Sequence, residues 1–308
     1  MSSFQPVMQE LTSKIVDMAI RVHEAVSTKF LPSEVRFMYN LNMRELTNIF
    51  QGCCLSKGDY YIKPVMLARL FTHESQRVYA DRLVTEDEVE TFTGVFNEIV
   101  KSGLVGPLIS AEDLFEPNNM FTNFVTTSDG SYLPIPSMEK LKSVLDTKLV
   151  EYNDNNAIMD LVLFKQAILH IARINRIIQN PGGNAMLVGV GGSGKQSLCR
   201  LAAYMSEFDV RQISVTSNYG VENLKEQLRS IYLAAGVRGK PTVFLMTDSQ
   251  IVNEKFLVYI NGMLTSGWIP DLFPKEDLEN ILGSIANEQN LWEFQITQRP
   301  EPISSFRK

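Results

Sequence analysis

A glycine-rich segment at residues 189–195 has the residue types and the spacing of a phosphate-binding loop. It reads Gly-Val-Gly-Gly-Ser-Gly-Lys, which fits the pattern G-x-x-x-x-G-K. Glycines let the backbone turn so that successive N–H groups point into one concavity, where they can bind phosphate oxygens. A helix that begins at the end of the loop adds its partial positive charge, and Lys195 can reach the outer phosphates. The segment therefore predicts a nucleotide site that binds ATP or ADP.

The predicted site continues into the helix that follows the loop. A phosphate-binding loop normally has Ser or Thr after the lysine, and that hydroxyl binds Mg²⁺. This chain has Gln196 there, followed by Ser197, and an amide oxygen is a weaker Mg²⁺ ligand. Nucleotide binding should survive the change, because backbone amides supply most of it. The residues predicted to bind the nucleotide are Gly189, Gly191, Gly192, Ser193, Gly194, Lys195, Gln196 and Ser197.

The same glycines also fit G-x-G-x-x-G, the pattern of a dinucleotide-binding loop. That function needs an acidic residue at the end of the second strand, where it binds the ribose. Here Asp209 precedes the strand predicted at residues 210–215, and the chain leaves that strand through residues 214–217, which contain no acid. The dinucleotide interpretation is therefore rejected.

A second acidic position follows the strand predicted at residues 243–246. P-loop ATPases usually have an Asp for the Mg²⁺ shell and then a Glu that activates water, but the residues here are Thr247, Asp248 and Ser249. If the two acidic positions of the motif directly follow the apolar residues 243–246, Asp248 takes the position of the base. If the motif is shifted by one residue, Asp248 takes the position of the metal-shell acid. One carboxylate is missing in either case, and loss of a general base removes about 10²–10⁴ in rate. Asp248 is thus the candidate catalytic residue, and hydrolysis of ATP should be slow or absent. The predicted Mg²⁺ ligands are Gln196, Ser197 and Asp248.

Alternating elements surround these motifs. We expect a parallel sheet covered by helices on both faces, because strand and helix patterns alternate from residue 156 onward. The fold class predicted is therefore α/β, a three-layer P-loop domain preceded by a small all-helical domain. The predicted elements are a helix at 159–178, a break at 180–183, a strand at 185–188, a helix to about 205, a strand at 210–215, a helix at 221–235 and a strand at 243–246.

The first hundred residues show helical periodicity. Apolar side chains recur every three or four residues in the first helix, at Met8, Leu11, Ile15, Met18, Val22 and Val26. Ser33 is the expected N-cap of a second helix that ends near Gly52, a third should span 64–83, and a fourth should run from 86 to about 101 and stop at Gly103. The predicted domains are a helical domain at 1–105, a connector with short strands and a helix at 106–155, an incomplete P-loop domain at 156–288 and a tail at 289–308.

Composition excludes several classes of function. The net charge of −6 gives no support for binding nucleic acid, and no apolar stretch approaches the roughly 20 residues that a membrane-spanning helix needs. Three cysteines, two of them adjacent, form neither a disulfide framework nor a metal-ligand pattern, so buried reduced thiols in a cytosolic protein are expected.

Several segments together resemble the axonemal dynein heavy chains. The P-loop with Gln196 and the sequence Phe-Leu-Met-Thr-Asp-Ser-Gln at 244–250 are similar to the fourth AAA+ module of the dynein motor ring. Residues 37–52 and 73–83 are similar to the small helical domain of the third module. The resemblance implies an AAA+ fold for the P-loop domain, and it places Arg44 at the position of the arginine that contacts nucleotide held by the third module.

The resemblance also implies a parent protein that is a microtubule motor ATPase of the cilium or flagellum axoneme, with a favoured inner-arm origin. Expected partners are neighbouring AAA+ modules and dynein-arm subunits, whereas microtubules would be bound only through parts outside this sequence. Residues 289–308 do not resemble the family, so the chain is expected to be a fragment. A non-enzymatic interaction fragment that exposes ring-interface surface is the alternative, and an active isolated ATPase is disfavoured because AAA+ sites are normally completed by an arginine from the next module.

Overall fold

The computed structural model describes residues 6–127 and 129–285 and divides the chain into two compact units. The first unit ends at Arg176, and the second begins at Ile177. No helix among the described residues is long and apolar enough to cross a membrane.

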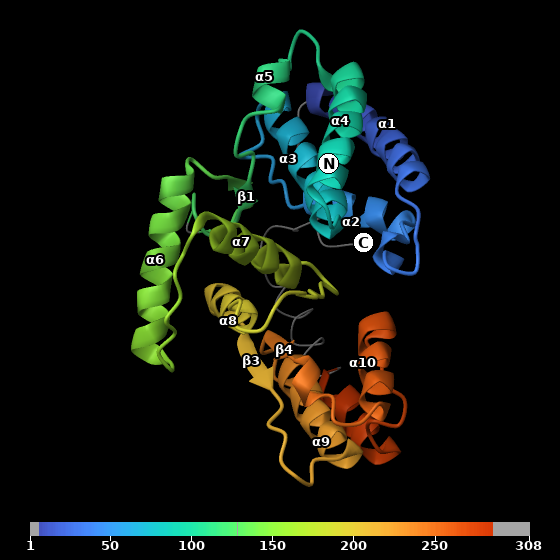
Figure 1. Ribbon diagram of the computed structural model, residues 1–308, viewed down its shortest axis with the longest axis vertical. Coiled ribbons are helices and arrows are strands. Elements are labelled where there is room, and N and C mark those ends of the chain that lie inside the picture. Colours follow the sequence, from blue (N-terminus) through green and yellow to red (C-terminus); the bar gives the residue numbers. More distant parts are fainter. Residues whose placement is uncertain (1–5, 128, 286–308) are drawn as a thin grey trace, which may run out of the picture. The chain divides into compact units, whose positions relative to one another are not determined.

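Four helices form the core of the first unit: α1 (Pro6–Lys29), α2 (Met43–Cys53), α3 (Pro64–Tyr79) and α4 (Glu86–Leu104). Helix α1 packs against α3 and α4, and α2 packs against α3 (Figure 1). The six apolar residues that predicted α1 are all buried, together with Phe71, Phe92 and Phe96 of the other helices. The helical prediction for this part of the chain is confirmed.

Two predicted helix ends are wrong. Ser33 closes a turn by accepting a hydrogen bond from the Arg36 N–H, and α2 begins ten residues later with Asn42 as its N-cap. Asn42 Oδ1 accepts from the Arg44 N–H at 2.9 Å, and Glu45 Oε2 accepts from the Asn42 N–H at 2.7 Å, so this pair satisfies the free amides of the first turn. Gly103 does not stop α4, which continues to Leu104; a side chain at Gly103 would collide with the thioether of Met18.

The segment after α4 contains the predicted short strands. Helix α5 (Ala111–Leu114) precedes β1 (Phe121–Thr122), which pairs antiparallel with β2 (Leu133–Pro134), and α6 (Met138–Asn155) follows. Helix α7 spans Lys165–Gln179, so the predicted helix at 159–178 begins six residues too early. The Asn153 amide explains the difference, because it donates to the Met159 carbonyl and accepts from the Met159 N–H, which holds this residue outside a helix.

A buried network around Glu74 joins α3, the β2 segment and α7 within the first unit. The Glu74 carboxylate is fully buried, and Arg176 donates to both of its oxygens, with Nε at 3.1 and 3.0 Å. Tyr132 donates its hydroxyl to Glu74 Oε1 at 2.9 Å and contacts His73 Nε2 at 3.1 Å. Burial holds the pKa of His73 well below its usual value, so the imidazole is neutral. We call these four residues the Glu74 network.

The second unit contains α8 (Lys195–Met205), β3 (Asp209–Gln212), α9 (Val221–Tyr232), β4 (Thr242–Leu245) and α10 (Lys255–Ser266). A π-helical turn, Leu233–Val237, extends α9, and residues 275–285 are also helical. Strands β3 and β4 are parallel, with Asp209 opposite Thr242 and Gln212 opposite Leu245, and α8 packs on both. Buried apolar residues of α9, α10 and the segments that follow β3 and α10 form one core cluster: Ile213, Leu224, Leu228, Phe256, Ile269 and Leu272.

The strand predicted at residues 185–188 is absent. In the described part of the second unit the sheet consists of β3 and β4, and residues 183–190 form no ladder with it. Met186 and Val188 are consequently 84% and 86% exposed, although they were expected in a buried strand. A buried strand needs partner strands and covering helices, and this segment has neither among the described residues. The α/β class with parallel strands is therefore confirmed, whereas the three-layer sheet is not.

Gly52 generates a prediction, because a Cβ there would overlap the carboxylate of Glu74. We expect Gly52→Ala to destabilise the first unit by about 1–3 kcal/mol, since the buried Glu74 carboxylate cannot move away without breaking its hydrogen bonds with Arg176. Gly94→Ala is the matched control: this glycine is also helical, exposed and without neighbours within 4 Å, so the change should stabilise by roughly 0.5–1 kcal/mol. Denaturant unfolding would measure both, and equal stability of the two variants would contradict the packing role of Gly52.

Candidate phosphate-binding site

The glycine-rich loop of the second unit has backbone conformations that only glycine adopts readily. Gly192 and Gly194 have φ angles of 76° and 75°, in the left-handed region. Gly194 is the N-cap of α8, and its carbonyl accepts the Leu198 N–H at 2.9 Å. The loop thus leads directly into a helix N-terminus, where free N–H groups and the helix dipole favour an anion.

Lys195 holds the loop together. Its Nζ donates to the carbonyls of Gly189 and Val190, both at 2.7 Å, and to Ser193 Oγ at 3.2 Å. Ser193 in turn donates to the Val190 carbonyl at 2.9 Å. The structure therefore brings the predicted residues 189–195 into one loop, with the ammonium group of Lys195 at its centre. A cation beside a helix N-terminus can bind a phosphate group.

Gln196 faces strand β3. Its Oε1 accepts a hydrogen bond of 3.5 Å from Gln212 Nε2, and Gln212 Oε1 accepts from Arg200. Neither Gln212 nor Arg200 was among the predicted site residues. Arg200 lies one turn after Gln196 on α8, and this i, i+4 spacing is the sequence signal that could have identified it. Ser197, the next predicted ligand, is half-buried on the same helix.

Asp248 lies just after β4, where it begins the short 3₁₀ helix η4 (Asp248–Gln250). Its side chain is exposed, as is that of Ser249, while Thr247 is half-buried and contacts Ser249 Oγ at 3.1 Å. Among the described residues no hydrogen bond or ion pair joins Asp248 to Lys195, Gln196 or Ser197, so the structure does not join the two halves of the predicted site by direct contact. Nor do the described residues include a cluster of three or more His, Cys, Asp or Glu side chains that could hold a metal.

Gln250 connects the ends of the two strands, a role that the sequence did not predict. Its Oε1 accepts from the Thr247 N–H at 2.8 Å, and its Nε2 donates to the Ile213 carbonyl at 2.6 Å. Residue 213 follows β3 and residue 247 follows β4, so this one amide fixes the carboxyl edge of the parallel pair. The segment that carries Asp248 is positioned by this contact.

Arg44 lies in the first unit, on the exposed surface of α2. Its predicted contact with a nucleotide held by another module stays a prediction. The charged residues of the predicted site in the second unit are Lys195 and Asp248, and the structure adds Arg200 through its contact with Gln212.

Comparison with known proteins gives two family matches. Residues 159–301 match the P-loop containing dynein motor region D4, and residues 15–105 match an AAA+ lid domain. The first match extends into residues 289–301, which the sequence analysis had set apart as a tail and which lie outside the described residues.

Curated relatives are similar over nearly the whole chain. The sequence is 43% identical over 307 residues to a dynein beta chain of the flagellar outer arm from Chlamydomonas reinhardtii, covering 95% of this chain and 7% of that protein. It is 46% identical over 280 residues to dynein axonemal heavy chain 17 from Mus musculus, covering 91% and 6%. The chain thus spans less than a tenth of the length of these relatives. An outer-arm protein is among them, so they lend no support to an inner-arm origin.

The Gln250 contact yields a prediction for the second unit. Gln250→Leu removes both hydrogen bonds and leaves the Thr247 N–H and the Ile213 carbonyl without them, which should destabilise this unit by about 1–3 kcal/mol. Ser249→Ala, at the exposed neighbouring position, should change stability little. Amide hydrogen exchange of β3 and β4 would measure the effect, and unchanged protection in Gln250→Leu would show that the amide does not hold the strands.

Proposed function

We propose that this chain, which belongs to the axonemal dynein heavy chain family, is a nucleotide-binding part of the motor ring that hydrolyses ATP slowly or not at all. The observation that carries the proposal is the loop at residues 189–195, with two left-handed glycines, a helix N-terminus and Lys195 at its centre. ATP and ADP both present phosphate groups to such a loop, so either can be the bound nucleotide.

Mg²⁺ would enter with the nucleotide, whose phosphates supply most of its oxygen ligands. The chain offers three further oxygen donors, namely the Gln196 amide, the Ser197 hydroxyl and the Asp248 carboxylate. The exposed carboxylate of Asp248 suits a hard cation best. The Gln196 oxygen already accepts a hydrogen bond from Gln212, so it would have to give up or share that contact.

Slow hydrolysis follows from the residues after β4. Asp248 is the one acid there, and the next residue is an exposed serine, which cannot act as a general base. The chain can therefore supply a metal-shell acid or a base at this edge, but not both. In the intact ring, such a site would let bound nucleotide regulate neighbouring AAA+ modules while contributing little turnover.

The parent protein would be a microtubule motor ATPase of the cilium or flagellum, in contact with other dynein-arm subunits. Similar proteins are named as flagellar outer-arm and ciliary dynein chains, and this supports the assignment. Microtubule contact is assigned to parts of the parent outside this sequence.

A second candidate function rests on exposed apolar residues in the loop and in the segment before it. Met186, Val188 and Val190 are 84%, 86% and 78% exposed, a density of apolar surface that isolated domains usually bury. This segment supports a non-enzymatic role in which the chain binds neighbouring modules through ring-interface surface. Concentration-dependent association that is lost in Val188→Ser, with no nucleotide affinity, would favour this candidate.

Nucleotide binding is tested with Lys195→Ala. We expect wild-type protein to bind Mg-ATP and Mg-ADP saturably, and the variant to bind about 10–100-fold more weakly, because a charge-assisted contact worth about 1.5–3 kcal/mol is lost. Lys255→Ala is the control, since it removes the same charge from an exposed position on α10. Isothermal titration calorimetry would measure the affinity of all three proteins for Mg-ATP and Mg-ADP.

Two outcomes would contradict the proposal. Equal affinity of wild type and Lys195→Ala would show that the loop is not the binding site. Phosphate release well above background in wild-type protein, abolished by Lys195→Ala, would show that the chain hydrolyses ATP although the second carboxylate after β4 is missing.

A further inference from the structure

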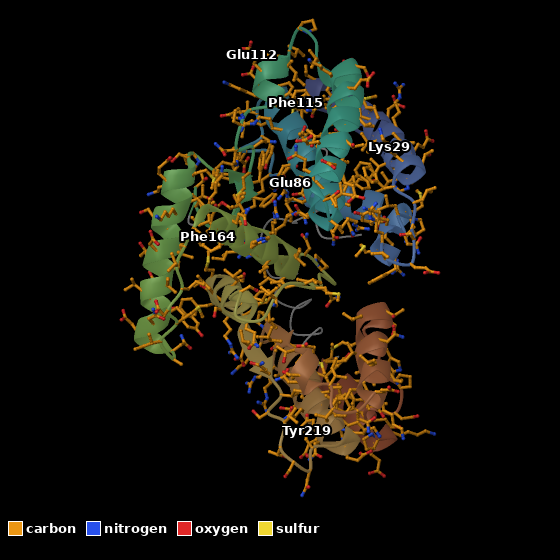
Figure 2. All side chains as sticks on the ribbon, in the orientation of Figure 1. Lys29, Glu86, Glu112, Phe115, Phe164 and Tyr219 are labelled. Atoms are coloured by element: carbon orange, nitrogen blue, oxygen red, sulfur yellow. The ribbon has the colours of Figure 1, made fainter. Side chains whose placement is uncertain are left out.

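A cavity of about 340 Å³, lined by both polar and apolar residues, lies within the first unit, and none of its lining residues belongs to the glycine-rich loop. Its walls come from α3, α4, the end of α5 with the residues that follow it, the first residue of α6 and the middle of α7; Figure 1 labels these helices. Phe115, labelled in Figure 2 at the end of α5, forms part of the apolar wall. The volume is in the range of small-molecule sites.

Two arginines line this cavity and share one counter-ion. Arg77 Nη1 lies 3.1 Å from Asp81 Oδ1, and Arg173 Nε lies 3.3 Å from the same oxygen. Two guanidinium charges thus face a single carboxylate. Burial lowers the pKa of Arg77, the attraction of Asp81 opposes this, and the charge of Arg173 lowers the pKa further.

The other charged groups around the cavity do not supply that negative charge. Glu74 is paired with Arg176, and Glu116 is paired with Arg69. His73, which also lines the cavity, is kept neutral by burial. The ionic contacts of the described residues therefore leave about one positive charge on the cavity wall.

Unpaired polar atoms accompany this charge. Arg77 Nε and Asn97 Oδ1 are buried without a hydrogen-bond partner, although both residues line the cavity. Leaving a buried polar group unpaired costs about 1–3 kcal/mol. The oxygen and nitrogen of an Asn amide can be exchanged by rotation, so Asn97 of α4 can present N–H donors to the cavity that the Arg77 guanidinium of α3 also lines.

We propose that the cavity is a binding site for a small oxyanion, such as phosphate or a small molecule that carries a phosphate or carboxylate group. The planar guanidinium groups of Arg77 and Arg173 match the oxygens of such an anion, and the Asn97 amide, which lines the same cavity, supplies a further donor. The anion neutralises the surplus charge and gives the Arg77 Nε–H an acceptor. This site is independent of the nucleotide proposal, because none of its residues belongs to the loop at 189–197.

Inorganic phosphate is the probe, and the experiment uses the full chain with Lys195→Ala, so that the glycine-rich loop contributes least. We expect the thermal unfolding midpoint of the first unit to rise saturably with phosphate at constant ionic strength. Asn97→Asp places a carboxylate in the lining of the cavity and should weaken phosphate binding at least tenfold, because this charge repels the anion. Asn48→Asp, at an exposed position on α2, is the control with the same charge change.

A second variant, Arg173→Met, keeps the test decisive if Asn97→Asp folds poorly, which circular dichroism would reveal. Loss of the phosphate effect in the cavity variants but not in Asn48→Asp would support the site. An equal rise of the unfolding midpoint in all variants would show a general effect of salt. Absence of a saturable rise in the protein without cavity substitutions would show that no oxyanion binds. Either result overturns the proposal.

Discussion

Burial of the Glu74 carboxylate is the constraint on which the first unit depends. An ionised carboxylate taken out of water loses several kcal/mol of hydration, and this loss is offset only when opposite charge and hydrogen bonds replace the water. Arg176 and Tyr132 provide them, and they come from segments 102 and 58 residues away in the sequence. Helix α7 and the β2 segment are therefore fixed to the helical core by an electrostatic requirement as well as by apolar packing.

Local patterns predicted much of this structure. The period of apolar residues identified α1, and the glycine spacing identified the loop before α8, because both signals depend on residues close together in the sequence. Helix ends were less predictable. The N-cap of α2 depends on Asn42, which accepts from the Arg44 N–H and donates to Glu45, and Gly103 lies inside α4, where a larger side chain would collide with Met18 of another helix.

The contacts that position the candidate site could not be predicted from residues close together in the sequence. Gln250 bridges residues 213 and 247, and Gln212 reaches Gln196 from a neighbouring strand, so both roles exist only once β3 and β4 are paired. The segment at 185–188 shows the reverse case. Its apolar run fits a buried strand, but strand formation depends on partners that the sequence of the segment itself does not specify. The same residues are left as exposed apolar surface beside the loop.

The two units thus carry different kinds of polar chemistry. The loop at 189–195 places a lysine and backbone amides at the surface, where a large anion can reach them. The cavity in the first unit places two largely buried arginines around a space of about 340 Å³, which suits a small anion. Both rely on positive charge that the local fold does not fully compensate.

The contact of Gly52 with Glu74 also limits how this sequence can change over time. A chain that first lost Arg176 would keep a buried carboxylate without its counter-ion, and a chain that first lost Glu74 would keep a buried guanidinium. A larger residue at position 52 is tolerated only after the carboxylate has gone. Each single replacement therefore costs stability that replacement of all three residues would avoid, so we expect the three positions to change as a group.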